Sequence, residues 1–177
     1  MKTRFAILIS VCLLGLSVWA EEGGYFIDSL SFGAGISRHD EIGISRFGVR
    51  KDSDYQFFKN STGWLSGYYE VSVGCWTGQD DTICNIAFSP VFVYYFGDPT
   101  WKVKPYIEAG IGASAISDTD LDSRNFSTIF QFEDRIGLGV QWEHLDMSVR
   151  YMHYSNGSIV QPNDGIDIYI ATLGYRF

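Results

Sequence analysis

Hydrophobic and polar residues alternate along most of the chain beyond residue 26, with the period of two that is typical of β-strands. The alternation is clearest over residues 129–142, where Asp134 interrupts an otherwise apolar row. The pattern predicts eight strands, of which the second alternates least well: residues 27–37, 42–51, 63–75, 84–96, 103–116, 129–142, 145–155 and 166–177.

Strands with one apolar and one polar face fit two architectures. A soluble sandwich would bury the apolar faces, whereas a membrane barrel would turn them to lipid and place the polar faces inside. The even strand number, lengths of about nine to eleven residues or more, and aromatic residues near the strand ends favour the barrel. The chain ends on Phe177 behind Leu173 and Tyr175, which resembles the ending of bacterial outer-membrane barrels. We therefore predict an all-β fold, an eight-stranded antiparallel transmembrane β-barrel.

An eight-stranded barrel is narrow, so side chains fill its interior. The inward rows carry charges of both signs, and buried charges are tolerated only when they are paired. We expect a salt-bridged plug made by Glu70, Glu108, Glu133, Arg135, Asp146 and Arg150. Such a barrel is not a pore, and it acts at its ends or on its outer wall.

The first twenty residues have the features of a secretory signal peptide. Two basic residues precede an apolar run over residues 5–18, and residues 18–20 (Val-Trp-Ala) fit the small-residue cleavage rule. The run is too short to favour a transmembrane anchor, and no later run is long enough for a spanning helix. We expect cleavage after Ala20, which leaves residues 21–177 as an outer-membrane barrel domain.

The charge of the mature chain bears on its binding partners, and its cysteines bear on a disulfide. Removing Lys2 and Arg4 with the signal peptide leaves 11 basic against 21 acidic residues, a net charge of −10. This balance argues against nucleic acid as a partner. Cys75 and Cys84 remain after cleavage and flank a polar segment. Export allows a disulfide across a strand–turn–strand tip, which we favour over two free thiols.

The strand over residues 145–155 ends in an unusual group of polar residues. Its apolar row continues into His153 and Ser155. A polar turn over residues 156–165 follows, and Asp167 on the next strand points to the same face of the sheet. His153 and Ser155 are roughly 7 Å apart along the strand, and Asp167 is about 5 Å to the side. These separations allow a relay in which His153 takes the proton of Ser155 while Asp167 fixes the imidazole tautomer.

The position of this relay indicates its substrate. Barrels of this type usually begin and end on the periplasmic side, so the turn over residues 156–165 should face away from the cell. A nucleophile on the lipid-facing wall at that rim meets lipid acyl esters, and attack by Ser155 would give an acyl-enzyme that water hydrolyses. Asn156, through its side chain or its backbone, is the nearest candidate for the oxyanion donor. No cofactor is implied by this chemistry, and the His and Cys spacings do not make a metal site.

The same residues also have an ordinary structural interpretation. A strand-end His beside Tyr is usually interfacial, and Ser-Asn-Gly is common turn chemistry. This interpretation corresponds to a non-catalytic outer-membrane barrel, structural or binding a surface partner through its loops. A further alternative is another lipid esterase or an acyltransferase with the same nucleophile. The loops over residues 52–62 and 117–127 are expected at the cell surface, where they would adjust the access of substrate.

One motif resembles the signature of the lipid A 3-O-deacylase (PagL) family: His153-Tyr154-Ser155-Asn156, then Ile159, Pro162-Asn163, Gly165 and Asp167. The resemblance implies an outer-membrane esterase that removes the 3-position hydroxyacyl chain from lipid A with a Ser–His–Glu relay on the outer wall. By this resemblance His153 is the base, Ser155 the nucleophile and Asn156 the residue linked to the oxyanion site. Asp167 stands where the family usually has Glu, and because Asp is one methylene shorter, its reach to His153 is the open point.

These observations together predict lipid A 3-O-deacylation in the bacterial outer membrane. The expected partner is lipid A or lipopolysaccharide, with the site towards the outer leaflet. The oligomeric state is left open, with a homodimer as one alternative.

Overall fold

The computed structural model describes residues 26–39 and 41–177. The predicted signal peptide, residues 1–20, lies outside the described residues. The strands of the described part are β1 (Ser29–Ser37), β2 (Gly43–Asp52), β3 (Phe57–Asn60), β4 (Gly63–Thr77), β5 (Thr82–Phe96), β6 (Val103–Ile116), β7 (Asp120–Leu121), β8 (Arg124–Asn125), β9 (Phe130–Trp142), β10 (Leu145–Ser155) and β11 (Ile166–Arg176).

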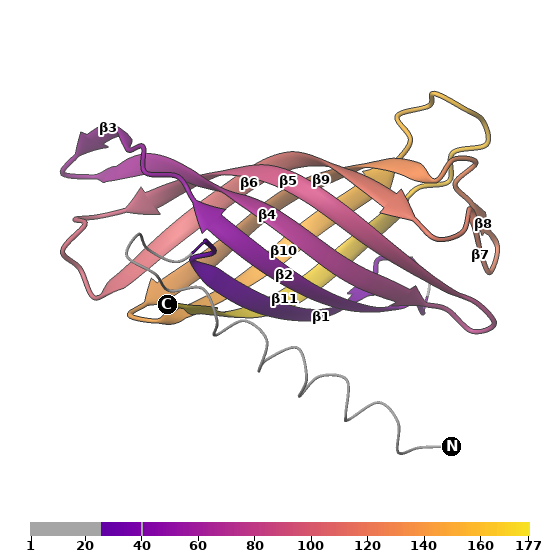
Figure 1. Cartoon of the computed structure of the whole chain (residues 1–177), viewed down its shortest axis with the longest axis horizontal. Helices are drawn as coiled ribbons and strands as arrows, with labels where there is room; N and C mark the ends of the chain where they lie inside the picture. The colour runs from indigo at the N-terminus through magenta and orange to yellow at the C-terminus, as the bar shows by residue number, and fades with distance from the viewer. Residues whose placement is uncertain (1–25, 40) are drawn as a thin grey trace, which may run out of the picture.

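Eight of these strands close into an antiparallel barrel (Figure 1). Around the barrel the order is β2, β1, β11, β10, β9, β6, β5 and β4, and β4 pairs with β2 to complete the ring. Closure gives every barrel strand a partner on both sides, which satisfies the backbone N–H and C=O groups where water is absent. β3 extends the sheet beside β4, and β7 and β8 form a separate small hairpin. The predicted eight-stranded antiparallel barrel is confirmed.

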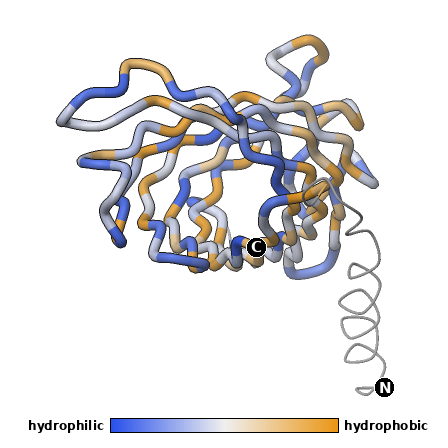
Figure 2. The backbone as a smooth tube through the Cα atoms, turned by 60° about the vertical axis from the view of Figure 1, so that its left-hand side comes forward, coloured by the Kyte–Doolittle hydropathy of each residue, from blue (hydrophilic) through white to orange (hydrophobic). Residues whose placement is uncertain are grey.

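The outer wall of the barrel is apolar. Phe32, Phe92, Ile111 and Leu138, from four different strands, are between 59% and 66% exposed. Apolar and polar residues alternate along the strands, as the changing colour of the tube shows in Figure 2. A wall of this kind suits contact with lipid acyl chains. Within the described ranges, no helix is long and apolar enough to cross a membrane.

Charged side chains fill the middle of the barrel. All six residues predicted for the plug are buried: Glu70, Glu108, Glu133, Arg135, Asp146 and Arg150. Arg46 and Arg50 of β2 also point inward, and the sequence reasoning missed both. The reason is that β2 turns Ile44 inward and Ser45 outward, which obscures its alternation. Among the described residues, four buried arginines therefore face four buried carboxylates, and the plug is neutral as a whole.

An apolar layer fills the interior at the end that carries the turn over residues 156–165. Its side chains are Ile42, Ile44, Trp76, Ile83, Ile116, Leu121, Phe126, Met152, Tyr154, Ile166, Ile168 and Ile170. Because this layer is made of large side chains in contact, the barrel is packed beneath the turn rather than open, as expected for a narrow barrel.

The two ends of the barrel carry different segments. β1 begins and β11 ends at the same end of the barrel, where the N–H of Phe177 donates to the carbonyl of Asp28 at 3.0 Å. The turns that follow β4, β6 and β10 lie at the opposite end (Figure 1). The expectation that residues 52–62 adjust the access of substrate was wrong, because β2 runs back to the end of the barrel where β11 finishes, away from the turn over residues 156–165. Asp52 forms a salt bridge with Arg176 next to the C-terminus.

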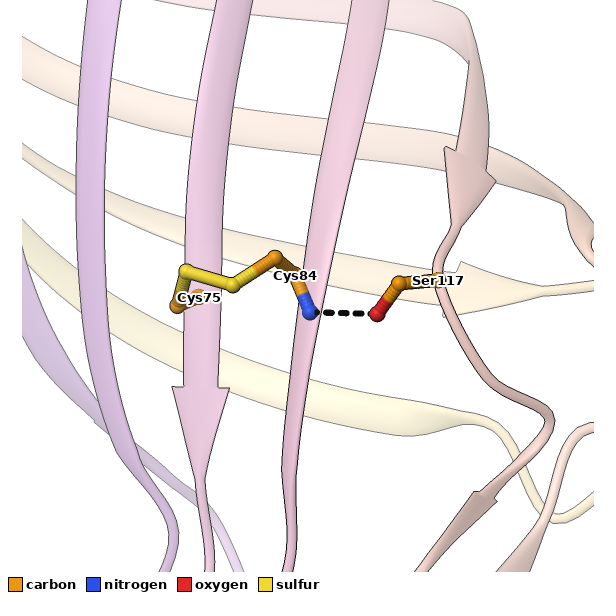
Figure 3. The surroundings of a disulfide bond; sticks show 3 residues. All are labelled: Cys75, Cys84 and Ser117. Atoms are coloured by element: carbon orange, nitrogen blue, oxygen red, sulfur yellow. Dashed lines mark hydrogen bonds between the residues drawn. A yellow bond between two sulfur atoms is a disulfide. The ribbon is translucent and has the colours of Figure 1, made fainter.

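Cys75 of β4 and Cys84 of β5 form a disulfide with an S–S distance of 2.02 Å (Figure 3). The two residues are directly opposite in the strand register, near the turn that joins these strands. The N–H of Cys84 also donates to Oγ of Ser117 at 3.0 Å, which links the bridge to the start of the loop after β6. In the ring of strands, β4 and β5 lie across the barrel from β10 and β11.

Replacing both cysteines with serine is expected to lower the free energy of unfolding by about 2–3 kcal/mol, because the bridge closes a short loop in the unfolded chain. The hydrolytic activity that the sequence predicts should stay within about twofold of wild type, since the bridge is remote from β10 and β11. Denaturant unfolding in detergent micelles measures the first quantity. Wild type treated with a reductant should behave like the variant, and equal stability of oxidised and reduced protein would refute a stabilising bridge.

Candidate active site

β10 and β11 bring the three predicted relay residues to one end of the outer wall. His153 lies directly opposite Asp167 in the register of the two strands. Ser155 is the last residue of β10, two positions beyond His153 on the same face. β10 ends there, and the turn that follows contains Gly157 and Ser158 with φ of 65° and 62°, a left-handed backbone that does not continue a strand. Strand pairing thus brings together the side chains that parity alone placed on one face.

His153 and Asp167 are hydrogen-bonded to each other. Nδ1 of His153 lies 2.8 Å from Oδ1 of Asp167. A carboxylate accepts, so this contact places a proton on Nδ1 and leaves Nε2 of the neutral ring free to take one. The two side chains are 39% and 23% exposed, so water and substrate reach them from outside the barrel. The shorter acid therefore reaches the histidine, which answers the open point about Asp in place of Glu.

Ser155 is half-buried beside His153 and Gly165. Gly165 has a φ of 57°, and a Cβ built on it would lie 3.3 Å from Cε1 of His153 and 3.5 Å from Cβ of Ser155. Glycine adopts this backbone without strain, and its small size allows the close approach to both side chains. Within the described part of the chain the Ser155 hydroxyl makes no hydrogen bond. Bonds between nucleophile and base are often long before substrate binds.

Asn156 is fully buried, and all its N–H groups are engaged. Its Nδ2 donates to the carbonyls of Phe126 at 3.0 Å and Val160 at 2.9 Å, and its backbone N–H donates to Oδ1 of Asn163 at 3.1 Å. An oxyanion role for Asn156 requires one of these bonds to open, and it stays a prediction. The amide nitrogen of Asn163, by contrast, has no hydrogen-bond partner among residues 26–39 and 41–177.

The loop between β6 and β9 braces the turn that carries the site. The N–H of Asn125 donates to Oδ2 of Asp164 at 2.7 Å, and Oγ of Ser127 donates to the carbonyl of Pro162 at 2.5 Å. The sequence had predicted that residues 117–127 adjust the access of substrate. That expectation stays a prediction, whereas the contacts show that this loop fixes the turn over residues 156–165 against the barrel.

The same loop is also joined to the turn between β4 and β5. The carboxylate of Asp122 accepts the backbone N–H groups of Gln79 at 2.9 Å and Asp80 at 3.1 Å. These bonds to the charged form lower the pKa of Asp122, so the carboxylate stays ionised and the two turns stay joined at neutral pH.

Tyr154, which lies between His153 and Ser155 in β10, anchors this strand to the charged interior. Its hydroxyl donates to Oε2 of Glu133 at 2.7 Å and accepts from a guanidinium N–H of Arg46 at 2.9 Å. Successive residues of a strand point to opposite faces. This inward anchor therefore holds the backbone from which the two neighbouring side chains point outward.

Two residues at the site escaped the sequence reasoning. The Tyr151 hydroxyl donates to Oδ1 of Asp167 at 2.7 Å. Asp134 lies directly opposite His153 on its other neighbour, β9. The break that Asp134 makes in its apolar row was a signal for it, whereas a Tyr on the outer wall is ordinary near a membrane interface. No group of three or more His, Cys, Asp and Glu in the described ranges is arranged to hold a metal ion.

The sequence profile of a known family, described as lipid A 3-O-deacylase (PagL), matches residues 43–176. The match runs from the first residue of β2 to the last residue of β11. The chain belongs to the PagL family. The matched segment of this PagL-family chain includes His153, Ser155, Asn156 and Asp167.

Individual PagL proteins agree with this assignment. Lipid A deacylase PagL of Pseudomonas aeruginosa is 42% identical over 128 residues, which are 70% of this chain and 72% of the relative. Lipid A deacylase PagL of Bordetella bronchiseptica is 39% identical over 89 residues, 50% of this chain and 47% of the relative. The crystal structure of the outer membrane enzyme PagL matches with a TM-score of 0.79 at 36% identity, covering 84% of this chain and 99% of that one. The chain therefore shares both sequence and barrel with PagL proteins.

Proposed function

We propose that this chain is an outer-membrane lipid A 3-O-deacylase, which hydrolyses the ester between the 3-position of lipid A and its hydroxyacyl chain. One observation carries the proposal: the 2.8 Å contact between His153 and Asp167 on the outer wall, two positions from the hydroxyl of Ser155. The names of the PagL relatives, lipid A deacylases, support lipid A as the substrate.

Ser155 acts as the nucleophile and His153 as the base. Oγ of Ser155 attacks the ester carbonyl carbon and passes its proton to Nε2 of His153. The tetrahedral intermediate then expels the 3-oxygen of lipid A, which takes the proton from His153, and the acyl chain stays on Ser155. Water attacks this acyl-enzyme with His153 again as the base. The bond to Oγ breaks, Ser155 regains its proton, and a 3-hydroxy fatty acid leaves.

Asp167 contributes by holding His153 in the tautomer that the reaction needs. Its bond to Nδ1 keeps Nε2 directed away from the acid, and its negative charge stabilises the imidazolium formed during attack. The bond is made across two paired strands, so the barrel itself sets the distance. A rigid strand pair of this kind reduces the reorganisation that the reaction requires.

The oxyanion needs a donor from the turn that follows Ser155. Asn156 has its N–H groups engaged, whereas Asn163 accepts the Asn156 N–H through Oδ1 and keeps its own amide nitrogen free. We infer that the donor comes from this pair of amides: from Asn163 directly, or from Asn156 once a bond opens. Preorganised donors of this kind are worth about 10²–10³ in rate.

The arrangement of the two barrel ends supports a reaction in the outer leaflet. The start of β1 and the end of β11 lie together at the end opposite the site, and the chain ends of outer-membrane barrels usually lie on the periplasmic side. The tight turn between β9 and β10 is also at that end, together with the longer segment over residues 53–62, whereas the longest connection, after β6, accompanies the site. Short periplasmic turns and longer outer loops are typical of such barrels, and the outer leaflet is where lipid A is found.

Mass spectrometry of lipid A tests the proposal. Cells whose lipid A carries the ester-linked 3-hydroxyacyl chain should lose one hydroxyacyl mass when they produce this chain, while cells with an empty vector should not. Phospholipids from the same cells should keep their acyl chains. An unchanged lipid A spectrum, with the barrel folded in the outer membrane, would contradict the proposal. A change confined to phospholipids would indicate a different lipid esterase.

A further inference from the structure

The carboxylate of Asp167 receives two hydrogen bonds on the same oxygen atom. Nδ1 of His153 lies 2.8 Å from Oδ1, and the hydroxyl of Tyr151 lies 2.7 Å from it. Tyr151 is opposite Tyr169 in the register of β10 and β11, so it reaches Asp167 diagonally, across one step of the strand pair. Diagonal neighbours are within reach of long side chains on one face of a sheet.

We propose that Tyr151 is a positioning residue that holds the Asp167 carboxylate in place for His153. This inference rests on the proposed relay. Tyr151 acts through Asp167 and takes no part in bond making, so it is not a catalytic residue. It adds a function to a side chain that would otherwise serve only as part of the lipid-facing wall.

The partly exposed setting of the acid explains why a second donor matters. The Asp167 side chain is 23% exposed at the rim of an apolar wall, where an ionised carboxylate with few partners is costly. Held by His153 alone, the carboxylate would keep freedom to rotate about the bond to its Cβ. A second hydrogen bond to a charged acceptor is strong and fixes that rotation. Because an Asp side chain is short, its oxygen cannot follow the histidine ring far, and a fixed carboxylate is needed.

Tyr169 provides the matched comparison for Tyr151. The two rings lie 5.5 Å apart on the same outward face, and both belong to the aromatic surface near the rim. Tyr169 is 49% exposed, and within the described residues its hydroxyl has no hydrogen bond. The two tyrosines thus share a face and an aromatic neighbourhood, but only the Tyr151 hydroxyl bonds to Asp167, and the Tyr151 side chain is also less exposed. A general interfacial role would make the two hydroxyls equivalent.

A double-mutant cycle on the purified full-length barrel in detergent micelles tests the proposal. Two rates are measured: the rate of lipid A deacylation and the rate at which a fluorophosphonate probe labels Ser155. Labelling reports an activated serine whatever the natural acyl donor is. Tyr151→Phe should lower kcat and the labelling rate about tenfold with KM nearly unchanged. Tyr169→Phe should stay within about twofold of wild type. Asp167→Asn should lower both rates by about 10²-fold or more, and adding Tyr151→Phe to it should have no further effect.

The proposal is overturned if Tyr151→Phe matches wild type. It is also overturned if Tyr151→Phe lowers both rates by the same factor in the Asp167→Asn background as in the wild-type background. The second result would mean that the hydroxyl acts independently of the acid. Labelling also separates this inference from the choice of substrate. If lipid A is untouched but labelling shows the coupling, lipid A is the wrong substrate and the positioning role stands. If Ser155 of the wild type is never labelled, both the relay and the role of Tyr151 are overturned.

Discussion

Replacing Ser155 with alanine is expected to reduce the release of 3-hydroxy fatty acid from lipid A by about 10³-fold or more, because no acyl-enzyme forms without the nucleophile. The loss should appear in kcat rather than in KM, since the outer wall that contacts the acyl chains is unchanged. Stability should change by less than about 0.5 kcal/mol, because the Ser155 hydroxyl makes no hydrogen bond within the described part of the chain. Time courses of fatty-acid release from purified protein, followed by mass spectrometry, measure the effect.

Ser158 supplies the control for this experiment, because it is an exposed serine in the same turn. Ser158→Ala removes a hydroxyl of the same kind and should deacylate lipid A at a rate within about twofold of wild type. If Ser155→Ala kept more than about a tenth of the wild-type rate, the nucleophile would be another group. The contacts between the turn over residues 156–165 and the loop between β6 and β9 would then need an explanation other than support of the nucleophile.

The outer wall was predictable because lipid imposes a simple requirement. Every strand of a membrane barrel needs one apolar face, and with a period of two this requirement is visible in the sequence. The same logic placed His153, Ser155 and Asp167 on one face, since parity survives small errors in the strand ends. The register that sets His153 directly opposite Asp167 comes from the structure, because the turn over residues 156–165 is too long to fix it.

The interior was less predictable because its side chains pack against one another, and contact with lipid imposes no pattern on them. Ile166, Ile168 and Ile170 face inward on β11, so the first half of its inward row carries no polar signal. Arg46 and Arg50 were hidden for the related reason that β2 mixes apolar and polar residues on each face. Any neutral, close-packed combination satisfies a barrel interior, and the sequence does not indicate which one is present.

The supporting contacts of the site were not predictable for a different reason. Asn156 binds the carbonyl of Phe126, which is 30 residues away in a loop without a periodic pattern. The sequence placed Asn156 next to the nucleophile and so favoured an oxyanion role. The structure shows that its donors hold the turn, so an oxyanion role requires one of these bonds to open. A side chain's hydrogen-bond partners depend on how loops meet in space, and neither parity nor spacing contains that information.

Replacing Glu70 with glutamine is expected to destabilise the barrel by about 3–5 kcal/mol, the usual cost of breaking a buried ion pair from one side. Oε1 of Glu70 accepts from Arg46 at 2.9 Å and from Arg135 at 2.8 Å, and Oε2 accepts from Arg50 at 2.9 Å. The side chain is fully buried. Glutamine keeps the shape but removes the charge, which leaves an excess of buried positive charge, and its amide NH₂ cannot accept from an arginine.

Denaturant unfolding in lipid vesicles, followed by tryptophan fluorescence, measures this cost, and Glu143→Gln is the control because Glu143 is exposed in the turn between β9 and β10. The control should change stability by less than about 0.5 kcal/mol. Adding Arg135→Met to Glu70→Gln should recover part of the loss, since it removes one of the uncompensated charges. If Glu70→Gln unfolds like wild type, the central carboxylate is dispensable and the plug is held by packing rather than by charge.

The rate of deacylation by Glu70→Gln tests whether the plug also positions the site. Tyr154, between His153 and Ser155, bonds to the same charged network through Glu133 and Arg46. A plug that positions β10 predicts that kcat falls with stability, whereas a purely structural plug predicts an unchanged kcat for every molecule that remains folded.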